Sequence, residues 1–235
     1  MEKSFIKRTF TTRNVAILGM MAALSYILQI SMRIPLVPGF RGSYEPSDVF
    51  ILLAGFMINP LGAIIISFIV GILHMFTFGQ SGWHGAVMNI ASSAVFCGLA
   101  SAIYHKFKSF KAAIFGLIIA IIATVGVMIL LNIWITPIYF GMPREAVYGM
   151  ILPAITPFNL LKYSLSAALF VMIYSPTYKA LQGARLLPKQ AQLAPKRIRI
   201  NPIIFAGVAL LILIVISLWL NRERIIEFLT QYHGI

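Results

Sequence analysis

Long apolar runs separated by short polar connections alternate along most of the 235 residues of this chain. A helix needs about 20 predominantly apolar residues to cross the hydrocarbon core of a bilayer. The runs therefore predict membrane-spanning helices at residues 14–32, 61–78, 85–104, 112–135, 157–174 and 203–220, with a shorter segment at 48–58. As a helix, the short segment covers only about 17 Å. It must therefore tilt little, lie partly within the protein or extend at either end.

Composition places the chain in the membrane class. Hydrophobic residues make up 60% of it, charged residues make up 11%, and the mean hydropathy is +0.90. These values exclude an ordinary soluble domain and predict an all-α integral membrane protein in contact with the lipid bilayer. The formal net charge of +13 would suggest nucleic-acid binding in a soluble protein. Here the basic residues gather in alternate connections, so we expect no nucleic-acid partner.

The lysines and arginines also predict the orientation, because basic residues are enriched on the cytoplasmic side of membrane proteins. One predicted side carries Lys3, Lys7, Arg8, Arg13, Lys106, Lys108, Lys111, Lys179, Arg185, Lys189, Lys196, Arg197 and Arg199. Before the seventh run, the opposite side carries only Arg33, Arg41 and Arg144. We therefore expect a multi-pass cell-membrane protein with a cytoplasmic N-terminus and, if the seventh run inserts, an outer C-terminus. The first span has no small-residue cleavage site after it, so no cleavable signal peptide is expected.

The same pattern divides the chain into three parts. Residues 1–181 form a six-helix membrane body. Residues 182–201 are basic and contain Pro188 and Pro195, which predicts a cytoplasmic linker rather than a packed element. Residues 202–235 hold the seventh apolar run and a short outer tail, which predicts an additional transmembrane helix.

A polar face opens the sixth predicted span. Asn159 and Lys162 stand three residues apart, so they share one face of a helix. A lysine in a membrane segment usually meets a partner, a cavity or a ligand, although its long side chain can also snorkel to the interface. Thr156 and Pro157 suit the N-cap and the first helical position, and Asn132 lies late in the fifth span. We expect Asn132, Asn159 and Lys162 to converge at similar depth beneath the outer connections.

The outer connections carry further candidate groups. Residues 35–47 combine prolines, glycines and aromatics, which favours an ordered flap over a solvated linker. At the end of this segment, Ser47 or Asp48 suits a helix cap, and Glu45 suits a role in binding or gating. Residues 79–85 place glycines around Trp83, which offers either a stacking face for a ligand or an anchor at the membrane interface.

Signals for catalysis and for metal binding are weak. Cys97 is the sole cysteine, which excludes an intramolecular disulfide and a multi-cysteine metal site. His74 and His84 lack a carboxylate or cysteine companion at ligand spacing, so no metal site is expected. The chain has no glycine-rich phosphate loop, nucleophile elbow or zinc-protease helix. We therefore expect neither an ATPase site nor an enzyme.

A stripe of small residues marks the first predicted span. Gly19 and Ala23 are four residues apart, with Ala22 beside them. Such a stripe lets another helix approach closely, either within the chain or from another subunit.

Five pieces of the sequence, taken in order, resemble the substrate-binding S component of energy-coupling-factor (ECF) vitamin transporters, closest to the riboflavin-specific type. They are the small-residue stripe, residues 45–49, residues 54–62, the glycine-rich connection leading to Met88 and Asn89, and residues 157–162. The resemblance covers about residues 10–181. It implies a six-helix body with a vitamin pocket near the outer face, and no resident cofactor, because riboflavin is the transported ligand.

The resemblance also implies partners and site residues. Gly19, Ala22 and Ala23 would dock onto a membrane T subunit that carries two ATPase subunits. In riboflavin-specific members, the residues that match Asn132, Asn159 and Lys162 bind the flavin. The first two outer connections add to the expected binding set Ser43, Tyr44, Glu45, Gly82, Trp83 and Gly85. Candidate apolar walls are Phe40, Tyr44, Trp83 and Phe158.

Capture of riboflavin for ATP-driven import is therefore the leading hypothesis, and three alternatives stay open. The first is an S component for a phosphorylated flavin such as FMN, for pyridoxine or for folate, with Lys162 and either Arg41 or Arg144 meeting a phosphate. The second is a membrane enzyme. The third is a structural scaffold, which predicts no small-molecule binding at all.

Overall fold

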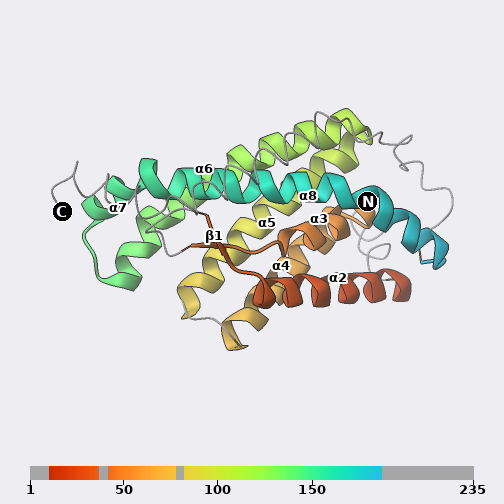
Figure 1. Cartoon of the computed structure of the whole chain (residues 1–235), viewed down its shortest axis with the longest axis horizontal. Helices are drawn as coiled ribbons and strands as arrows, with labels where there is room; N and C mark the ends of the chain where they lie inside the picture. The colour runs from red at the N-terminus through yellow and green to blue at the C-terminus, as the bar shows by residue number, and fades with distance from the viewer. Residues whose placement is uncertain (1–10, 37–41, 78–81, 187–235) are drawn as a thin grey trace.

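The computed structural model describes residues 11–36, 42–77 and 82–186. Apart from one small hairpin, its regular elements are helices (Figure 1). In chain order they are α2 (Thr12–Ser31), β1 (Ile34–Pro35), β2 (Ser43–Tyr44), α3 (Asp48–Met57), α4 (Pro60–Thr77), α5 (Gly82–Phe107), α6 (Phe110–Phe140), α7 (Arg144–Met150), the π-helix η1 (Ile151–Ile155) and α8 (Thr156–Gly183).

Five helical stretches of the described residues are long and apolar enough to cross a membrane. They are α2, α4, α5, α6 and the continuous stretch Arg144–Gly183, which α7, η1 and α8 form together. The expectation of an all-α membrane protein is therefore confirmed. Residues 187–235, which hold the seventh predicted span and most of the predicted linker, lie outside the described part of the chain.

The short apolar helix α3 lies inside the bundle. It contacts α2, α4, α5 and α8, and nearly all of its ten residues are buried. A helix surrounded by protein does not need the length that spans the hydrocarbon core. Of the three explanations for the short predicted segment, the structure therefore supports a position within the protein.

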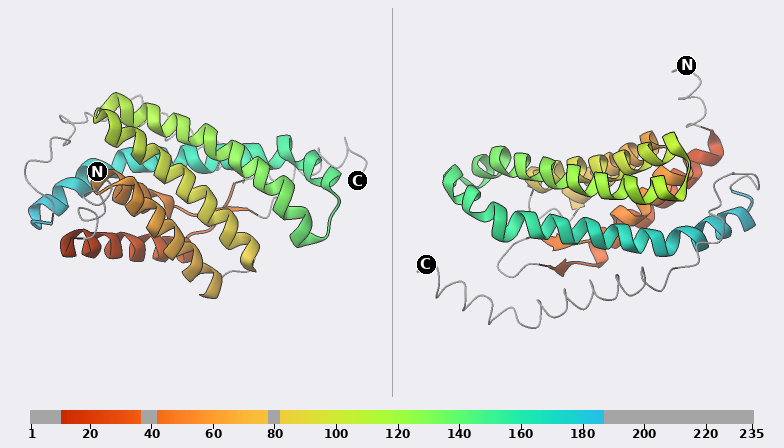
Figure 2. Two further views of the ribbon diagram at one scale, coloured as in Figure 1. Left: turned by 180° about the vertical axis from the view of Figure 1, so that it is seen from behind. Right: turned by 90° about the horizontal axis from the view of Figure 1, so that it is seen from above.

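The helices that pack around α3 are α2, α4, α5 and α8. Figure 2 shows α6 and α8 running roughly along the long axis of the molecule and α5 crossing it obliquely, and α6 contacts both other helices. The close approach of α4 and α5 depends on Gly71, because a Cβ at this position would lie 2.2 Å from Cγ1 of Ile90. Gly116 has the same role between α5 and α6, where a Cβ would lie 3.0 Å from the Ala100 carbonyl oxygen.

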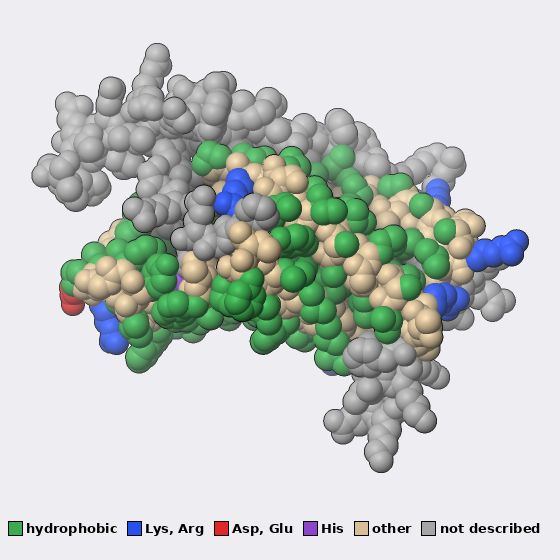
Figure 3. Space-filling view, turned by 90° about the horizontal axis from the view of Figure 1, so that it is seen from below, with side chains coloured by type: hydrophobic (Ala, Val, Ile, Leu, Met, Phe, Trp, Pro, Cys, Tyr) green, Lys and Arg blue, Asp and Glu red, His purple; other side chains and the backbone are tan. Residues whose placement is uncertain are grey.

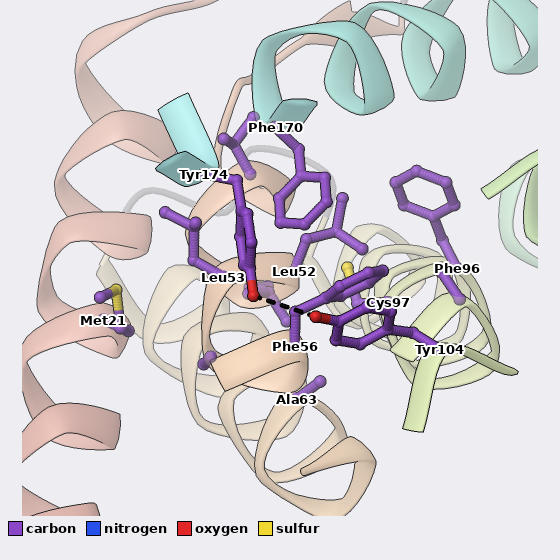
Figure 4. Close-up of a cluster of buried hydrophobic side chains, with 14 of the residues drawn as sticks. Met21, Leu52, Leu53, Phe56, Ala63, Phe96, Cys97, Tyr104, Phe170 and Tyr174 are labelled. Atoms are coloured by element: carbon purple, nitrogen blue, oxygen red, sulfur yellow. Dashed lines mark hydrogen bonds between the residues drawn. The ribbon is translucent and has the colours of Figure 1, made fainter. Parts of the chain in front are cut away.

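An aromatic cluster joins α3 to α5 and α8. The ring of Phe56 stacks on Tyr104 at 4.4 Å between centroids and lies 4.6 Å from the ring of Phe170. The hydroxyl groups of Tyr104 and Tyr174 lie 3.3 Å apart and form a hydrogen bond. Figure 4 shows these side chains pointing toward one another. The cluster fixes α3 at the centre, and so it also fixes the polar start of α3, where the candidate site lies.

Two predicted helix starts are wrong. α5 begins at Gly82, whose φ of +51° favours glycine, so Trp83 and Gly85 lie in its first turn and not in a loop. Thr156 does not cap α8, because the residue before it, Ile155, is already helical and the chain is continuous from η1. The Thr156 N–H donates to the Ile151 carbonyl, an i→i−5 bond of the π-helical type.

The surface suits a membrane environment. Figure 3 shows hydrophobic side chains over the middle of the molecule, with lysine and arginine mostly toward its ends. In Figure 1, the start of α2, the junction of α5 with α6 and the end of α8 lie at the same end. The basic residues of these segments are Arg13, Lys106, Lys108, Lys111, Lys179 and Arg185. α6 has 31 residues, or about 46 Å, which exceeds the roughly 30 Å of a hydrocarbon core.

Candidate binding site

The hairpin after α2 folds onto α8. Ile34 pairs with Tyr44, and Pro35 with Ser43. Leu36 and Tyr44 are buried in a hydrophobic cluster together with Phe158 and Leu165 of α8. The described parts of residues 35–47 are therefore ordered, as expected, and they bring Tyr44 and the neighbouring Glu45 into the interior.

Lys162 lies inside this structure and not at its surface. The residue is only 7% exposed, and its ammonium lies 5.6 Å from the centre of the Tyr163 ring. It interacts electrostatically with Asp48 and Glu45. Within the described residues, no carboxylate oxygen lies within 4.0 Å of it. Snorkelling to the interface is therefore excluded, and a buried cation is left without a direct ion pair.

Asp48 lies at the start of α3 and interacts electrostatically with Lys162. It is fully buried, and its Oδ1 accepts a hydrogen bond from Oγ of Ser93 on α5. Its Oδ2 has no hydrogen-bond partner among the described residues. The expectation that Ser47 or Asp48 caps α3 is wrong: Ser47 occupies the N-cap position without a side-chain capping bond, and Asp48 is bonded across to α5 instead.

Glu45 ties the hairpin to the bundle. Its carboxylate lies 3.6 Å from Nε of Arg33 and is hydrogen-bonded to Gln29 of α2. The guanidinium of Arg33 also reaches Nε2 of His74 on α4, at 2.9 Å. The Glu45 side chain therefore connects the hairpin to α2 directly and to α4 through Arg33. A role in binding or gating stays a prediction for this residue.

Burial governs the titration of the two hairpin groups. It raises the pKa of Glu45 above its ordinary value of 4.5, against the opposing effects of Lys162 and Arg33. Burial also raises the pKa of Tyr44 to about 12, while a hydrogen bond with Ser166 lowers it. The Tyr44 phenol therefore stays neutral at physiological pH and accepts a hydrogen bond from Oγ of Ser166 at 3.5 Å.

The buried Glu45 carboxyl predicts a pH dependence of stability. Because its pKa is raised on folding, the folded state binds this proton more tightly than the unfolded chain does. The stabilisation is complete below the unfolded pKa and is lost as the pH rises through the folded pKa. The melting temperature of the wild type relative to Glu45→Gln should therefore rise on acidification from about pH 8 to about pH 5.

Glu145→Gln is the matched control for this measurement, because it makes the same change at an exposed position on α7. It should show no such relative shift. A wild-type protein that loses stability relative to Glu45→Gln on acidification would contradict the raised pKa.

Asn159 adds a second buried polar group beside Lys162. Its Nδ2 donates to the carbonyl of Ile155 at 2.7 Å. Its Oδ1 is buried and has no hydrogen-bond partner in the described part of the chain. The site thus combines the Lys162 cation, which has no direct ion pair among the residues that the structure describes, with two buried oxygens. These oxygens, Oδ2 of Asp48 and Oδ1 of Asn159, have unused capacity to accept hydrogen bonds.

The structure does not connect Asn132 to this cluster. Its Nδ2 donates to the Met128 carbonyl at 2.8 Å, and its Oδ1 accepts from Thr136 Oγ1 at 3.0 Å. Thr136 in turn lies 3.2 Å from Nε2 of His84. None of these bonds reaches Asn159 or Lys162, so a role for Asn132 in binding stays a prediction.

Residues 82–85 pack against the end of α6. Trp83 is 49% exposed and meets the Tyr139 ring edge-on at 5.5 Å, and His84 stacks on the same ring at 4.8 Å. A Cβ at Gly82 would lie 3.4 Å from the Tyr139 hydroxyl. These contacts close α5 against α6, and ligand contacts of Gly82, Trp83 and Gly85 stay predictions. Phe40 and Arg41 lie outside the described residues.

The small-residue stripe of α2 faces outward. Gly19 and Ala23 are exposed, Ala22 is half-buried, and a Cβ at Gly19 would meet nothing within 4 Å. Glycine is therefore not needed here for packing within the chain. Within the described residues, no group of three or more His, Cys, Asp or Glu side chains is arranged to hold a metal ion.

Sequence reasoning missed the supporting polar groups Gln29, Arg33, His74, Ser93 and Ser166, which surround the carboxyl groups, the Tyr44 phenol and Lys162. Their signal was weak, because serine, glutamine and histidine often occur singly in membrane helices. Their shared location depends on four different helices, α2, α4, α5 and α8, meeting the hairpin.

A helical membrane bundle with buried charged and amide groups beneath an ordered hairpin is typical of membrane proteins that bind a substrate or an ion. Residues 13–174 match the family described as ECF transporter, substrate-specific component. The chain belongs to this family, and so it is a transport subunit and not an enzyme.

Three relatives show how far the similarity extends. The riboflavin transporter RibU of Staphylococcus aureus (strain TCH60) is 30% identical over 164 residues, which cover 67% of this chain and 86% of the relative. RibU of Lactococcus lactis subsp. cremoris (strain NZ9000) is 29% identical over 188 residues, covering 69% and 91%. A solved S component of a bacterial ECF transporter has a TM-score of 0.61 and 30% identity, covering 72% of this chain and 96% of that one.

Proposed function

We propose that this S component captures riboflavin outside the cell and delivers it for ATP-driven uptake. The observation that carries the proposal is the buried Lys162 with unpaired acceptors on Asp48 and Asn159, beneath the hairpin. The RibU relatives support the choice of riboflavin over other vitamins.

The chemistry of the site suits a flavin. Isoalloxazine is flat and amphipathic, and its edge carries several hydrogen-bond acceptors. An ammonium group and an amide between apolar walls complement such a ligand. In this proposal Lys162 and Asn159 bind the flavin edge, and Tyr44 and Phe158 form walls. The remaining contacts are assigned to Asn132, Ser43, Glu45, Gly82, Trp83 and Gly85.

The proposal includes partners and an orientation. The stripe of Gly19, Ala22 and Ala23, of which Gly19 and Ala23 are exposed, docks onto a membrane T subunit that carries two ATPase subunits, since small residues let a partner helix approach closely. The basic end of the molecule faces the cytoplasm, following the enrichment of lysine and arginine on that side. The N-terminus is then cytoplasmic and the hairpin faces outward.

The test is a spectroscopic titration of the detergent-purified chain. Yellow protein, or quenching of riboflavin fluorescence at about one flavin per chain with sub-micromolar affinity, is the expected result. Titration with FMN measures the affinity for the main alternative ligand. Arg144 is a candidate contact for its phosphate. Colourless protein that does not quench riboflavin would contradict the proposal and direct the search to pyridoxine or folate.

A further inference from the structure

Asp48 combines three properties that are costly together. Its side chain is fully buried, it carries an ionisable carboxyl, and one of its oxygens has no hydrogen-bond partner among the described residues. A buried acceptor without a donor loses the hydrogen bonds that water would give it, which is destabilising, and more so for a charged group. Such a group needs a function or a partner to explain it.

The described residues around the Asp48 carboxyl provide some stabilising interactions for it, but no hydrogen-bond donor for its Oδ2. Ser93 donates to Oδ1, and Asp48 lies in the first turn of α3, where the helix dipole favours a negative charge. Lys162 interacts with the carboxyl electrostatically but lies beyond 4.0 Å of it. These effects stabilise the charge, yet none of them gives Oδ2 an N–H or O–H donor.

We infer that Asp48 is a specificity-determining residue that accepts a hydrogen bond from a neutral N–H or O–H group of the ligand. This inference rests on the proposed function. Ser93 fixes the carboxyl through Oδ1, so Oδ2 is held in place for the ligand. Lys162 then acts as a hydrogen-bond donor and Asp48 as a separate acceptor. A neutral ligand that carries both an acceptor and a donor can bond to the two residues at once.

A flavin has two sources of such a donor, the imide N3–H of the ring and the hydroxyl groups of the ribityl chain. Lumiflavin lacks the ribityl hydroxyls, and N3-methylriboflavin lacks the imide N–H. Comparing these two ligands with riboflavin therefore identifies the donor that Asp48 accepts.

The experiment combines these three ligands with Asp48→Asn. Asparagine keeps one oxygen for Ser93 but turns an NH₂ group toward the donor of the ligand, so two donors face each other. Asp48→Asn should weaken riboflavin binding at least about tenfold, which corresponds to about 1.4 kcal/mol. The loss should shrink to less than about threefold for the ligand that lacks the matching donor.

Two further variants keep the test decisive. Glu145→Gln makes the same chemical change at an exposed site and should leave all three affinities unchanged. If Asp48→Asn does not fold, Ser93→Ala keeps the carboxyl but removes the bond that orients it. It should weaken binding of riboflavin more than binding of the ligand without the matching donor.

The result that would overturn the inference is an equal loss for all three ligands, which marks a structural role, or no loss at all. Riboflavin binding by the wild type is measured first. If the wild type does not bind riboflavin, the proposed function fails. If it does bind and the losses are equal, only the role of Asp48 fails.

Discussion

Lys162→Ala is expected to weaken riboflavin binding between about tenfold and about 100-fold. The substitution removes a desolvated cation, and hydrogen bonds to charged groups contribute about 1.5–3 kcal/mol. Lys162 is 7% exposed and has no ion pair within 4.0 Å in the described residues, so its hydrogen-bonding capacity remains for the ligand. Asn159→Ala removes a neutral partner on the same face and should weaken binding at least about tenfold.

The matched control for the first substitution is Lys179→Ala, which removes an exposed lysine from the far end of the same helix. It should leave the affinity unchanged. Removing Lys162 takes a nearby cation from the buried Asp48 and leaves Glu45 with Arg33 alone. The helical circular dichroism and the gel-filtration profile must therefore be measured as well. Wild-type affinity in folded Lys162→Ala and Asn159→Ala would contradict the assignment of this site.

Gly19→Trp is expected to reduce riboflavin uptake at least about tenfold while riboflavin affinity stays within about twofold. Gly19 is exposed on α2, and a Cβ there would meet nothing within 4 Å, so the new side chain disturbs no contact within the described residues. A bulky indole instead keeps a partner helix from approaching. Uptake is measured in cells that also produce the T and ATPase subunits, and affinity is measured on the purified chain.

Ile122→Trp provides the control, because Ile122 is 66% exposed on α6 and lies away from the stripe. It should leave both uptake and affinity unchanged. Normal uptake by Gly19→Trp would show that the stripe on α2 is not the docking surface. A joint loss of uptake and affinity would instead indicate a folding defect.

Helix existence was predictable because it depends on local sequence. A run of about 20 apolar residues is a membrane helix wherever it lies in the chain, and the runs at 61–78 and 112–135 correspond to α4 and α6. Helix ends were less predictable. Thr156 and Pro157 carry the signals of a helix start, yet the π-helical turn of residues 151–155 makes the helix continuous through them.

The site was predictable only in part. Lys162 and Asn159 were identified because polar groups on one face of an apolar helix are costly in a membrane. The cap expected at Asp48 was wrong, because its carboxyl bonds to Ser93, which is 45 residues away in the sequence. No local pattern specifies a contact at that separation.

The sequence by itself determined that this chain is a helical membrane protein, which residues are the costly polar ones and which end of the bundle is basic. These properties follow from hydropathy, helical periodicity and charge, all of which act over a few turns of helix. Only the tertiary structure decided that α3 is buried and that Asp48, Glu45 and Lys162 lie within electrostatic reach of one another. The physical reason is that the packing of α2, α5 and α8 around α3, and of the hairpin against α8, sets those positions.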